Sequence, residues 1–323
     1  MFRRLLFSAF FLATSATWAA PSLSVTADTT SDARPKSGIS EIDSLPLHDW
    51  DAAKHSLSIP LTVGLSAVIP GGGQFYSGHP VRGSFLLGLE SLLFGLSLYS
   101  YYVDLPRYDR QTGSMLDSAD AAFDRMTHNP AQQADAQSDF EYWTSAARIN
   151  ASRRLQQADL ANSELAWALG LHFYAITDAF EIAVKSHHSE PRKRSVQRAM
   201  WYGLAFPGGA QLYNERYGKF GMLWMAIGAS AVSGWSRQNV VESLNRSVGT
   251  ARIERSADFE KLDVDRTLYR KRRNQYYWGI ALLYVYGVMD GMVDASLSDF
   301  DARNRYALGP GPTPLSMMAS IHF

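Results

Sequence analysis

The chain has 323 residues, of which 46% are hydrophobic and 19% are charged, which is enough material for two domains. Its 31 basic and 31 acidic residues cancel, so no net field recruits nucleic acid or an acidic substrate. Cysteine is absent, which excludes disulfides, thiolate metal sites and thiol catalysis.

The N-terminus has the layout of a secretory signal peptide. Two arginines precede an apolar run at 5–12, and small residues follow it. We therefore predict a signal peptide over residues 1–20, with an uncleaved anchor as the alternative. This places the protein in the bacterial cell envelope, in the inner membrane. Residues 21–56, rich in Ser, Thr and Asp, are then an exported linker with little side-chain area to pack.

Four later apolar blocks approach the length of a membrane span. They are 81–103, 165–184, 217–235 and 277–297. A helix rises ~1.5 Å per residue, so about twenty residues cross a hydrocarbon core of ~30 Å. Tyr and Trp gather at block ends, as they do at membrane interfaces, and we predict an all-α polytopic membrane protein with about four long membrane helices. Acidic residues inside three blocks favour the alternative, a soluble all-α protein.

Two shorter apolar blocks, 57–69 and 199–206, each precede a glycine-rich turn. As helices they span roughly 20 Å or less, so we expect them to be interfacial or re-entrant. The polar segments 104–164 and 236–275 are expected to continue as helices beyond the membrane. A break at Asn129-Pro130 is predicted in the first, because the residue before proline avoids helical backbone angles.

The glycine-rich turns read PGGGQFY and PGGAQLY and recur at an offset of 137 residues. The shared residues are Pro70, Gly71, Gly72, Gln74 and Tyr76 in the first turn and Pro207, Gly208, Gly209, Gln211 and Tyr213 in the second. Further along the chain the offset is 112, where Asn162, Tyr174 and Asp178 match Asn274, Tyr286 and Asp290. The second copy is therefore 25 residues shorter than the first, and the difference falls in the polar segment between the helices.

These matches predict an internal duplication. Repeat unit 1 covers 57–185, a basic linker covers 186–198, repeat unit 2 covers 199–300, and 301–323 form a C-terminal tail. Each unit contains a short apolar segment, a glycine-rich turn, a helix, a polar segment and a late helix that ends near an acid.

The two turns resemble the bacterial membrane family named domain of unknown function 5683. The pattern of that family is a Pro-Gly-x-Gly-Gln-x-Tyr-Asn turn, a basic residue and glycine soon after, and a late helix that closes on Asp-Ala-x-Val-Asp-Ala. VMDGMVDASL at 288–297 is similar to this closing element, and ITDAFEIAV at 176–184 is less so. There is weaker similarity to the two-transmembrane-helix domain family. The resemblance implies two tandem copies of an all-helical membrane fold and no known activity.

The joint recurrence of turn and acid predicts a site. Proline ends the short helix, and the glycines of the first turn, Gly71 to Gly73, permit left-handed backbone angles. We expect the free N–H groups of each turn to hold a carboxylate, Asp178 or Asp290, with the Gln and Tyr of the turn completing the cluster. Glu181 and Asp294 lie one helical turn further on. The cluster is either a structural contact or a binding or conduction site.

No catalytic motif is present. The sequence lacks Gly-x-Ser-x-Gly and His-Glu-x-x-His, and no Lys-Ser/Thr follows the glycines, so we predict a non-enzymatic protein without metal or cofactor. His172, inside an apolar block, is typical of a hydrogen-bonded core histidine. Glu90 has no counterpart in unit 2, where Ile227 stands, and either pairs inside the bundle or faces a cavity.

The predicted partners are lipids and envelope proteins. The basic run Lys185–Arg198 indicates a topology determinant that can also attract anionic headgroups, at about 1 kcal/mol per charge near the surface. We predict a structural, scaffolding or assembly role in the membrane. Two alternatives remain: a small transporter or channel that uses the intramembrane acids, and a soluble exported helical protein.

Overall fold

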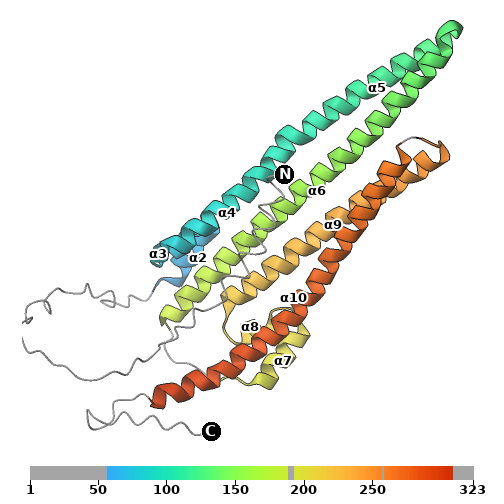
Figure 1. The fold of residues 1–323 in the computed structure, drawn as a ribbon. Helices are drawn as coiled ribbons and strands as arrows, with labels where there is room; N and C mark the ends of the chain where they lie inside the picture. Colours follow the sequence, from blue (N-terminus) through green and yellow to red (C-terminus); the bar gives the residue numbers. More distant parts are fainter. Residues whose placement is uncertain (1–56, 188–192, 257, 308–323) are drawn as a thin grey trace, which may run out of the picture. The chain divides into compact units, whose positions relative to one another are not determined.

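A computed structural model describes residues 57–187, 193–256 and 258–307, with the backbone alone over 299–307 (Figure 1). All of these residues belong to one compact unit, Ala53–Phe323. The predicted signal peptide at 1–20, the exported linker and most of the C-terminal tail lie outside the described residues.

The described residues are helical, as predicted, and contain no strand. The first half comprises α2 (Ile59–Val68), α3 (Gly72–Tyr76), α4 (Pro80–Tyr99), a π-helical turn (Ser100–Asp104), α5 (Leu105–His128), a 3₁₀ turn (Pro130–Gln132) and α6 (Gln133–His187). The second half comprises α7 (Val196–Ala205), α8 (Gly209–Tyr213), α9 (Tyr217–Ile253) and α10 (Phe259–Ala307).

The polar segments continue the long helices, as predicted, and form two helical hairpins. α4 runs through the π-helical turn into α5, and the wider turn accommodates Pro106, which would otherwise clash with the preceding turn. The first hairpin reverses at Asn129, which is extended (φ −131°, ψ 91°) before Pro130. The second reverses near Arg255, which has a left-handed φ of 54°.

α6 and α9 lie at the centre of the helical arrangement (Figure 1). α6 packs against α2, α3, α4 and α5 of its own half and against α9 of the other half. α10 packs against α9, α7 and α8. Among the described elements, α6 and α9 therefore carry the principal contact between the two halves.

Two helical segments, Pro80–His128 and Phe259–Ser298, are long and apolar enough to cross a membrane. Only 17% and 22% of their most apolar stretches are buried, so most of these side chains face outward. The other two predicted spans, on α6 and α9, are not among them. Acids interrupt the first, and glycine and serine lower the hydropathy of the second.

A buried polar cluster lies where the second hairpin meets α6. Asp159 is 3% exposed, and one of its carboxylate oxygens is 3.7 Å from Nε of Arg237. Burial raises the pKa of Asp159, and the charge of Arg237 only partly opposes this. Burial also raises the pKa of Tyr269 to about 12, with the Asp159 charge as a second cause. Both groups are thus biased toward their neutral forms.

This cluster predicts a pH effect on stability. Because the folded-state pKa of Asp159 is raised, its contribution is present below the unfolded pKa and is lost as pH rises through the folded value. We expect Asp159→Asn to gain stability relative to wild type as pH rises from about 4 to 7. Denaturant unfolding at several pH values measures this difference. An Asp159→Asn difference that is constant with pH would contradict it.

Candidate functional site

The first glycine-rich turn reverses the chain between α2 and α3. Gly71 has a left-handed φ of 77°, and a Cβ there would lie 2.4 Å from Gly83 O. Gly208, its counterpart, has φ 86°. Both positions therefore require glycine for the backbone angle, and Gly71 also requires it for the close approach of α4.

Gln74 connects the first turn to the late helix α6. Its side chain is fully buried, and Nε2 donates to Asp178 Oδ2 and to Ala175 O, both over 2.9 Å. Oε1 accepts from the Ser66 hydroxyl over 3.1 Å. The amide thus satisfies a carbonyl and a carboxylate of α6 at once, and the predicted contact between turn and aspartate is present.

Arg82, near the start of α4, supplies the charge that balances Asp178. Its guanidinium forms an ion pair with Asp178 Oδ1 and donates to the Tyr174 hydroxyl over 2.9 Å. The Asp178 side chain is 4% exposed, whereas that of Arg82 is 45% exposed. The carboxylate is therefore buried, and its cation lies at the edge of the cluster.

The second half contains a cluster of the same design. Gln211 Nε2 donates to Gly287 O over 2.7 Å and to Asp290 Oδ2 over 3.2 Å. Lys219 Nζ donates to Asp290 Oδ1 over 2.9 Å and to both oxygens of Asp294 over 2.8 Å. Lys219 thus bridges two carboxylates here, and Arg216 Nε lies a further 4.0 Å from Asp294 Oδ2.

Corresponding positions of the chain build both clusters. The pairs Gln74/Gln211 and Arg82/Lys219 are 137 residues apart, and Ala175/Gly287 and Asp178/Asp290 are 112 apart. The two bases were not predicted as site residues. Both bases follow their turn at the same spacing, which could have indicated them in the sequence. A search for identical residues misses them, because one is Arg and the other is Lys.

The expected anion site on the backbone of the turn is wrong. The N–H groups of Gly72, Gly73 and Phe75 all donate to atoms within 66–71. The turn leads directly into α3, so its N–H groups are used to close the turn and start the helix. The carboxylate is instead held by a glutamine side chain and a base.

The tyrosines of the turns do not complete the clusters, contrary to expectation. Tyr76 is 44% exposed, and the Tyr213 hydroxyl accepts from Ser195 N over 3.1 Å while its ring stacks on Tyr202. They stand two residues after the buried glutamine, which in a helix is the opposite side. Tyr76 is thus a surface residue, whereas Tyr213 is partly buried and packs beside α7.

The second acids of the two late helices have different partners. Glu181 accepts from Gly218 N over 2.6 Å, at the first turn of α9, where the free N–H groups of the helix stabilise a negative charge. Its other oxygen pairs with Lys185. Asp294 stays within its own half, with Lys219. Glu181 is therefore a contact between halves and not part of the first cluster.

Each turn contacts its late helix through one glycine and one alanine, and the two halves have these residues in opposite order. A Cβ added to Gly73 would lie 2.8 Å from Ala179 Cβ, and one added to Gly291 would lie 2.1 Å from Ala210 Cβ. Gly73 and Ala210 correspond, as do Ala179 and Gly291. Each contact thus has room for one methyl group, carried by α6 in the first half and by the turn in the second.

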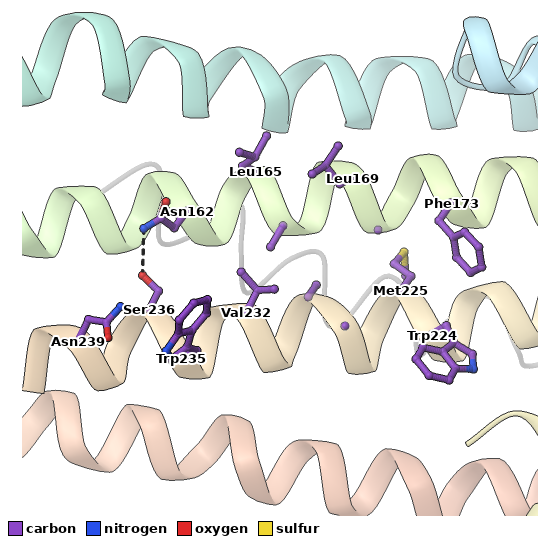
Figure 2. A pocket seen from close by; sticks show the side chains of 14 residues that line it. Asn162, Leu165, Leu169, Phe173, Trp224, Met225, Val232, Trp235, Ser236 and Asn239 are labelled. Carbon is purple, nitrogen blue, oxygen red and sulfur yellow. Dashed lines mark hydrogen bonds between the residues drawn. The ribbon is translucent and has the colours of Figure 1, made fainter. Parts of the chain in front are cut away.

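A groove of about 570 Å³ lies between α6 and α9 (Figure 2). Its lining comprises Asn162, Leu165, Ala166, Leu169, Gly170, Phe173, Trp224, Met225, Gly228, Ala229, Val232, Trp235, Ser236 and Asn239. At one end Asn162 Nδ2 donates to the Ser236 hydroxyl over 3.3 Å. The rest is predominantly apolar, and neither aspartate of the two clusters lines it.

The clusters offer no ready metal site. Within the described ranges, no three His, Asp or Glu side chains are grouped so as to hold a metal ion. Asp178, Asp290 and Asp294 are each engaged by Arg82 or Lys219, so a metal would have to displace that base. His188, beside His187, lies outside the described residues.

Residues 192–320 match the model of a family of unknown function (DUF5683). The match contains the second turn, Lys219 and both acids of α10, which agrees with the resemblance found in the sequence. The first turn at 70–76 lies outside it, so the family model matches one copy and not the two that were predicted. No curated protein and no solved structure matches the chain.

The small-residue contact predicts a mutation and its rescue. We expect Gly291→Ala to lower the free energy of unfolding by about 1–3 kcal/mol, because its Cβ overlaps Ala210 Cβ. Adding Ala210→Gly recreates the arrangement of the first half and should restore all but about 1 kcal/mol. Gly279→Ala, with open space around its Cβ, is the matched control. Equal losses in the single and double variants would refute the contact.

The buried carboxylate predicts unequal effects for its two partners. Arg82→Met leaves the Asp178 charge buried and unpaired, so we expect a loss of about 3 kcal/mol. Asp178→Asn still accepts from the Gln74 amide and leaves a half-exposed cation, so we expect about 1 kcal/mol. The double variant should be more stable than Arg82→Met alone.

Arg125→Met is the control for the loss of an arginine. Its ion pair with Asp139 measures 2.8 Å, and both side chains are 51% exposed. An exposed pair is worth at most about 1 kcal/mol. Unfolding curves of the variants in the same detergent decide the order, and an Arg82→Met loss no greater than that of Arg125→Met contradicts the expectation.

Proposed function

We propose that the chain is a non-enzymatic integral membrane protein of the bacterial cell envelope with a structural or scaffolding role. The observation that carries this proposal is the pairing of each buried aspartate with a base from its own half and with a buried glutamine amide. A carboxylate held in this way joins helices and is not free to exchange an ion. Both clusters therefore fit a fixed joint better than a transport site.

The depth of α6 follows from its contacts with α4. Near one end of α4, Arg82 pairs with Asp178, and near the other end the Ser97 hydroxyl donates to Ala161 O over 3.0 Å. If α4 crosses the hydrocarbon core, the stretch of α6 between these contacts crosses it too. The acids and small residues of α6 are then inside the bundle.

The same reasoning joins α9 to α10. Lys219 and Asp290 are 2.9 Å apart, and the guanidinium of Arg237 lies 4.3 Å from the centre of the Tyr276 ring. We therefore propose four spans, on α4, α6, α9 and α10. The two helices with the most outward-facing apolar side chains, α4 and α10, would face lipid.

We propose that the two halves are duplicated units with the same orientation. Each begins with a ten-residue helix, α2 or α7, which spans ~15 Å and so enters only about half of a ~30 Å core. The chain then returns through the glycine-rich turn. A re-entrant backbone is tolerated where protein satisfies its polar groups, as the Ser66 hydroxyl does for Gly73 N and Trp224 Nε1 does for Pro207 O.

Aromatic side chains support the proposed depth. At the end of α4 far from the turn, Tyr99 is 54% exposed and Tyr102 is 78% exposed. At the corresponding end of the α10 span, Tyr277 is 45% exposed and Trp278 is 69% exposed. Tyr and Trp favour the membrane interface, so we propose one boundary at these residues.

The helical hairpins beyond this boundary are the surface that a scaffold would present to envelope protein partners. Near the end of the first hairpin, Phe123 is 46% exposed and Tyr142 is 65% exposed. Aromatic side chains are enriched in protein interfaces. The molecule then consists of a fixed membrane base and two projecting arms.

The basic run Lys185–Arg198 is proposed to lie at the opposite boundary, near anionic lipid headgroups. Residues 188–192 of this run are outside the described residues. Lys185 pairs with Glu181 and Arg194 with Glu215, whereas the side chain of Arg198 is exposed. Lipid contact would thus fall mainly to Arg198 and the neighbouring basic residues.

The two alternatives have less support. The groove between the halves is predominantly apolar, so it supplies no polar path for the ion of a transporter or channel. A soluble protein would leave unusually large apolar areas in water, since Val81 is 84% exposed and Leu282 is 68% exposed on the two outer helices.

Topology is testable with single cysteines, because the chain has none of its own. We expect Ala131→Cys and Arg255→Cys, at the two hairpin ends, to react with a membrane-impermeant maleimide from the same side. His187→Cys should react from the other side only. Ala168→Cys, on α6 at a position only 1% exposed, is the unreactive control. Opposite sides for Ala131→Cys and Arg255→Cys would exclude the parallel four-span arrangement.

Ion flux separates a structural role from transport. In proteoliposomes we expect the purified chain to move H⁺, Na⁺ and K⁺ no faster than protein-free vesicles do. A flux abolished by Asp178→Asn and retained by the surface variant Asp139→Asn would replace the structural role with the transporter alternative.

A further inference from the structure

His172 joins three helices of the first half. Nε2 lies 3.2 Å from Ala67 O in the last turn of α2, and Nδ1 lies 2.9 Å from Glu90 Oε1 on α4. The second carboxylate oxygen of Glu90 is buried and has no hydrogen-bond partner in the described part of the chain. The imidazole is thus held between two acceptors.

The second half makes one of these contacts and lacks the other. The Tyr284 hydroxyl donates to Leu204 O over 2.7 Å. Tyr284 follows His172 by 112 residues, and Leu204 follows Ala67 by 137, so the two contacts correspond. The counterpart of Glu90 is Ile227. A donor from the late helix to the end of the short helix is therefore common to both halves, and the acid occurs in the first alone.

The partners of the imidazole fix its protons. A carbonyl oxygen only accepts, so Nε2 must carry a hydrogen to bind Ala67 O. The 2.9 Å contact between Nδ1 and Glu90 Oε1 needs a second proton, on one atom or the other, because two lone pairs facing each other repel. Without that proton the pair has a net negative charge, and the imidazole has one N–H group for two acceptors, Ala67 O and Glu90 Oε1. One of the two contacts must then break.

The pair has no other charge within its own half to stabilise the deprotonated form. α2 has no ionisable side chain, and Glu90 is the one charged side chain of α4 after Arg82; Tyr99, at the far end of α4, is more than two turns away. The nearest charged groups of α6 are Glu164 and Asp178, each about two turns away along the helix. Arg82 and Asp178 are also committed to each other.

The remaining elements packed on α4 and α6 add little. α3 carries Tyr76 as its one ionisable side chain, and it is exposed. Tyr174 on α6 accepts from Arg82. α9, against the other side of α6, has no charged residue in 220–236. The proton of the pair is therefore the local charge-balancing group.

We propose that His172 and Glu90 form a proton-binding site whose bound proton strengthens the attachment of α2, and with it the first glycine-rich turn, to α4 and α6. The second half, with Tyr284 and Ile227, keeps its short helix α7 docked through a hydroxyl group, without an imidazole or a carboxyl group. The site makes the first turn responsive to pH and the second unresponsive. It does not depend on the scaffolding role.

Hydrogen exchange on the full chain in detergent micelles tests this site. Peptides covering 59–69 and 196–206 report on α2 and α7, each corrected for the intrinsic pH dependence of exchange. The lost contact involves a charged group, so we expect the opening of α2 to increase about ten-fold between pH 6 and 8.5 in wild type. α7 in the same sample should change less than about two-fold, which makes it an internal control.

Two variants separate the proton from the packing. In Glu90→Gln the amide can donate to Nδ1 while Nε2 keeps Ala67 O, so the contacts persist without a titrating proton. Glu90→Ile with His172→Tyr copies the second half. We expect the pH response of α2 to vanish in both. A response retained in Glu90→Gln, an equal response of α2 and α7, or no response of wild-type α2 would each overturn the proposal.

Discussion

The buried amide of Gln74, repeated at Gln211, is the interaction on which the rest of the arrangement depends. The helix that carries it has only five residues and is too short to be stable by itself. By donating to a carbonyl and a carboxylate of the late helix, the amide fixes this short helix and orients the aspartate toward its base. The ion pairs follow from that placement.

The two clusters share one geometry, but they differ in how fully the glutamine amide is hydrogen-bonded. In the first, the Ser66 hydroxyl donates to the oxygen of the glutamine amide and leaves no room for a side chain at Gly73. In the second, glycine stands at the position of that serine, Ala210 fills the space, and Gln211 Oε1 is buried without a partner in the described residues. A hydrogen bond in one half is thus exchanged for methyl packing in the other.

The sequence was sufficient to predict the helical class, the helical continuation of the polar segments with a break at Asn129, and the contact of Asp178 and Asp290 with the turns. These depend on periodicity, proline and recurrence, which are local or repeated. It did not predict the partners: Glu181 binds the adjacent half, which depends on which helices become neighbours. The predicted backbone anion site was wrong because it assumed that the N–H groups of the turn are free. In the structure those groups close the turn and start the short helix.

The contact of Glu181 with Gly218 also has a consequence for how many units the chain can join. In the proposed duplication, Glu181 corresponds to Val293 and Gly218 corresponds to Val81. Both valines are at outer ends and are exposed. The halves thus meet head to tail, an open mode of association that could in principle continue. Valine at each free end supplies neither the carboxylate nor the close backbone approach, so the Glu181–Gly218 contact has no equivalent at the free ends.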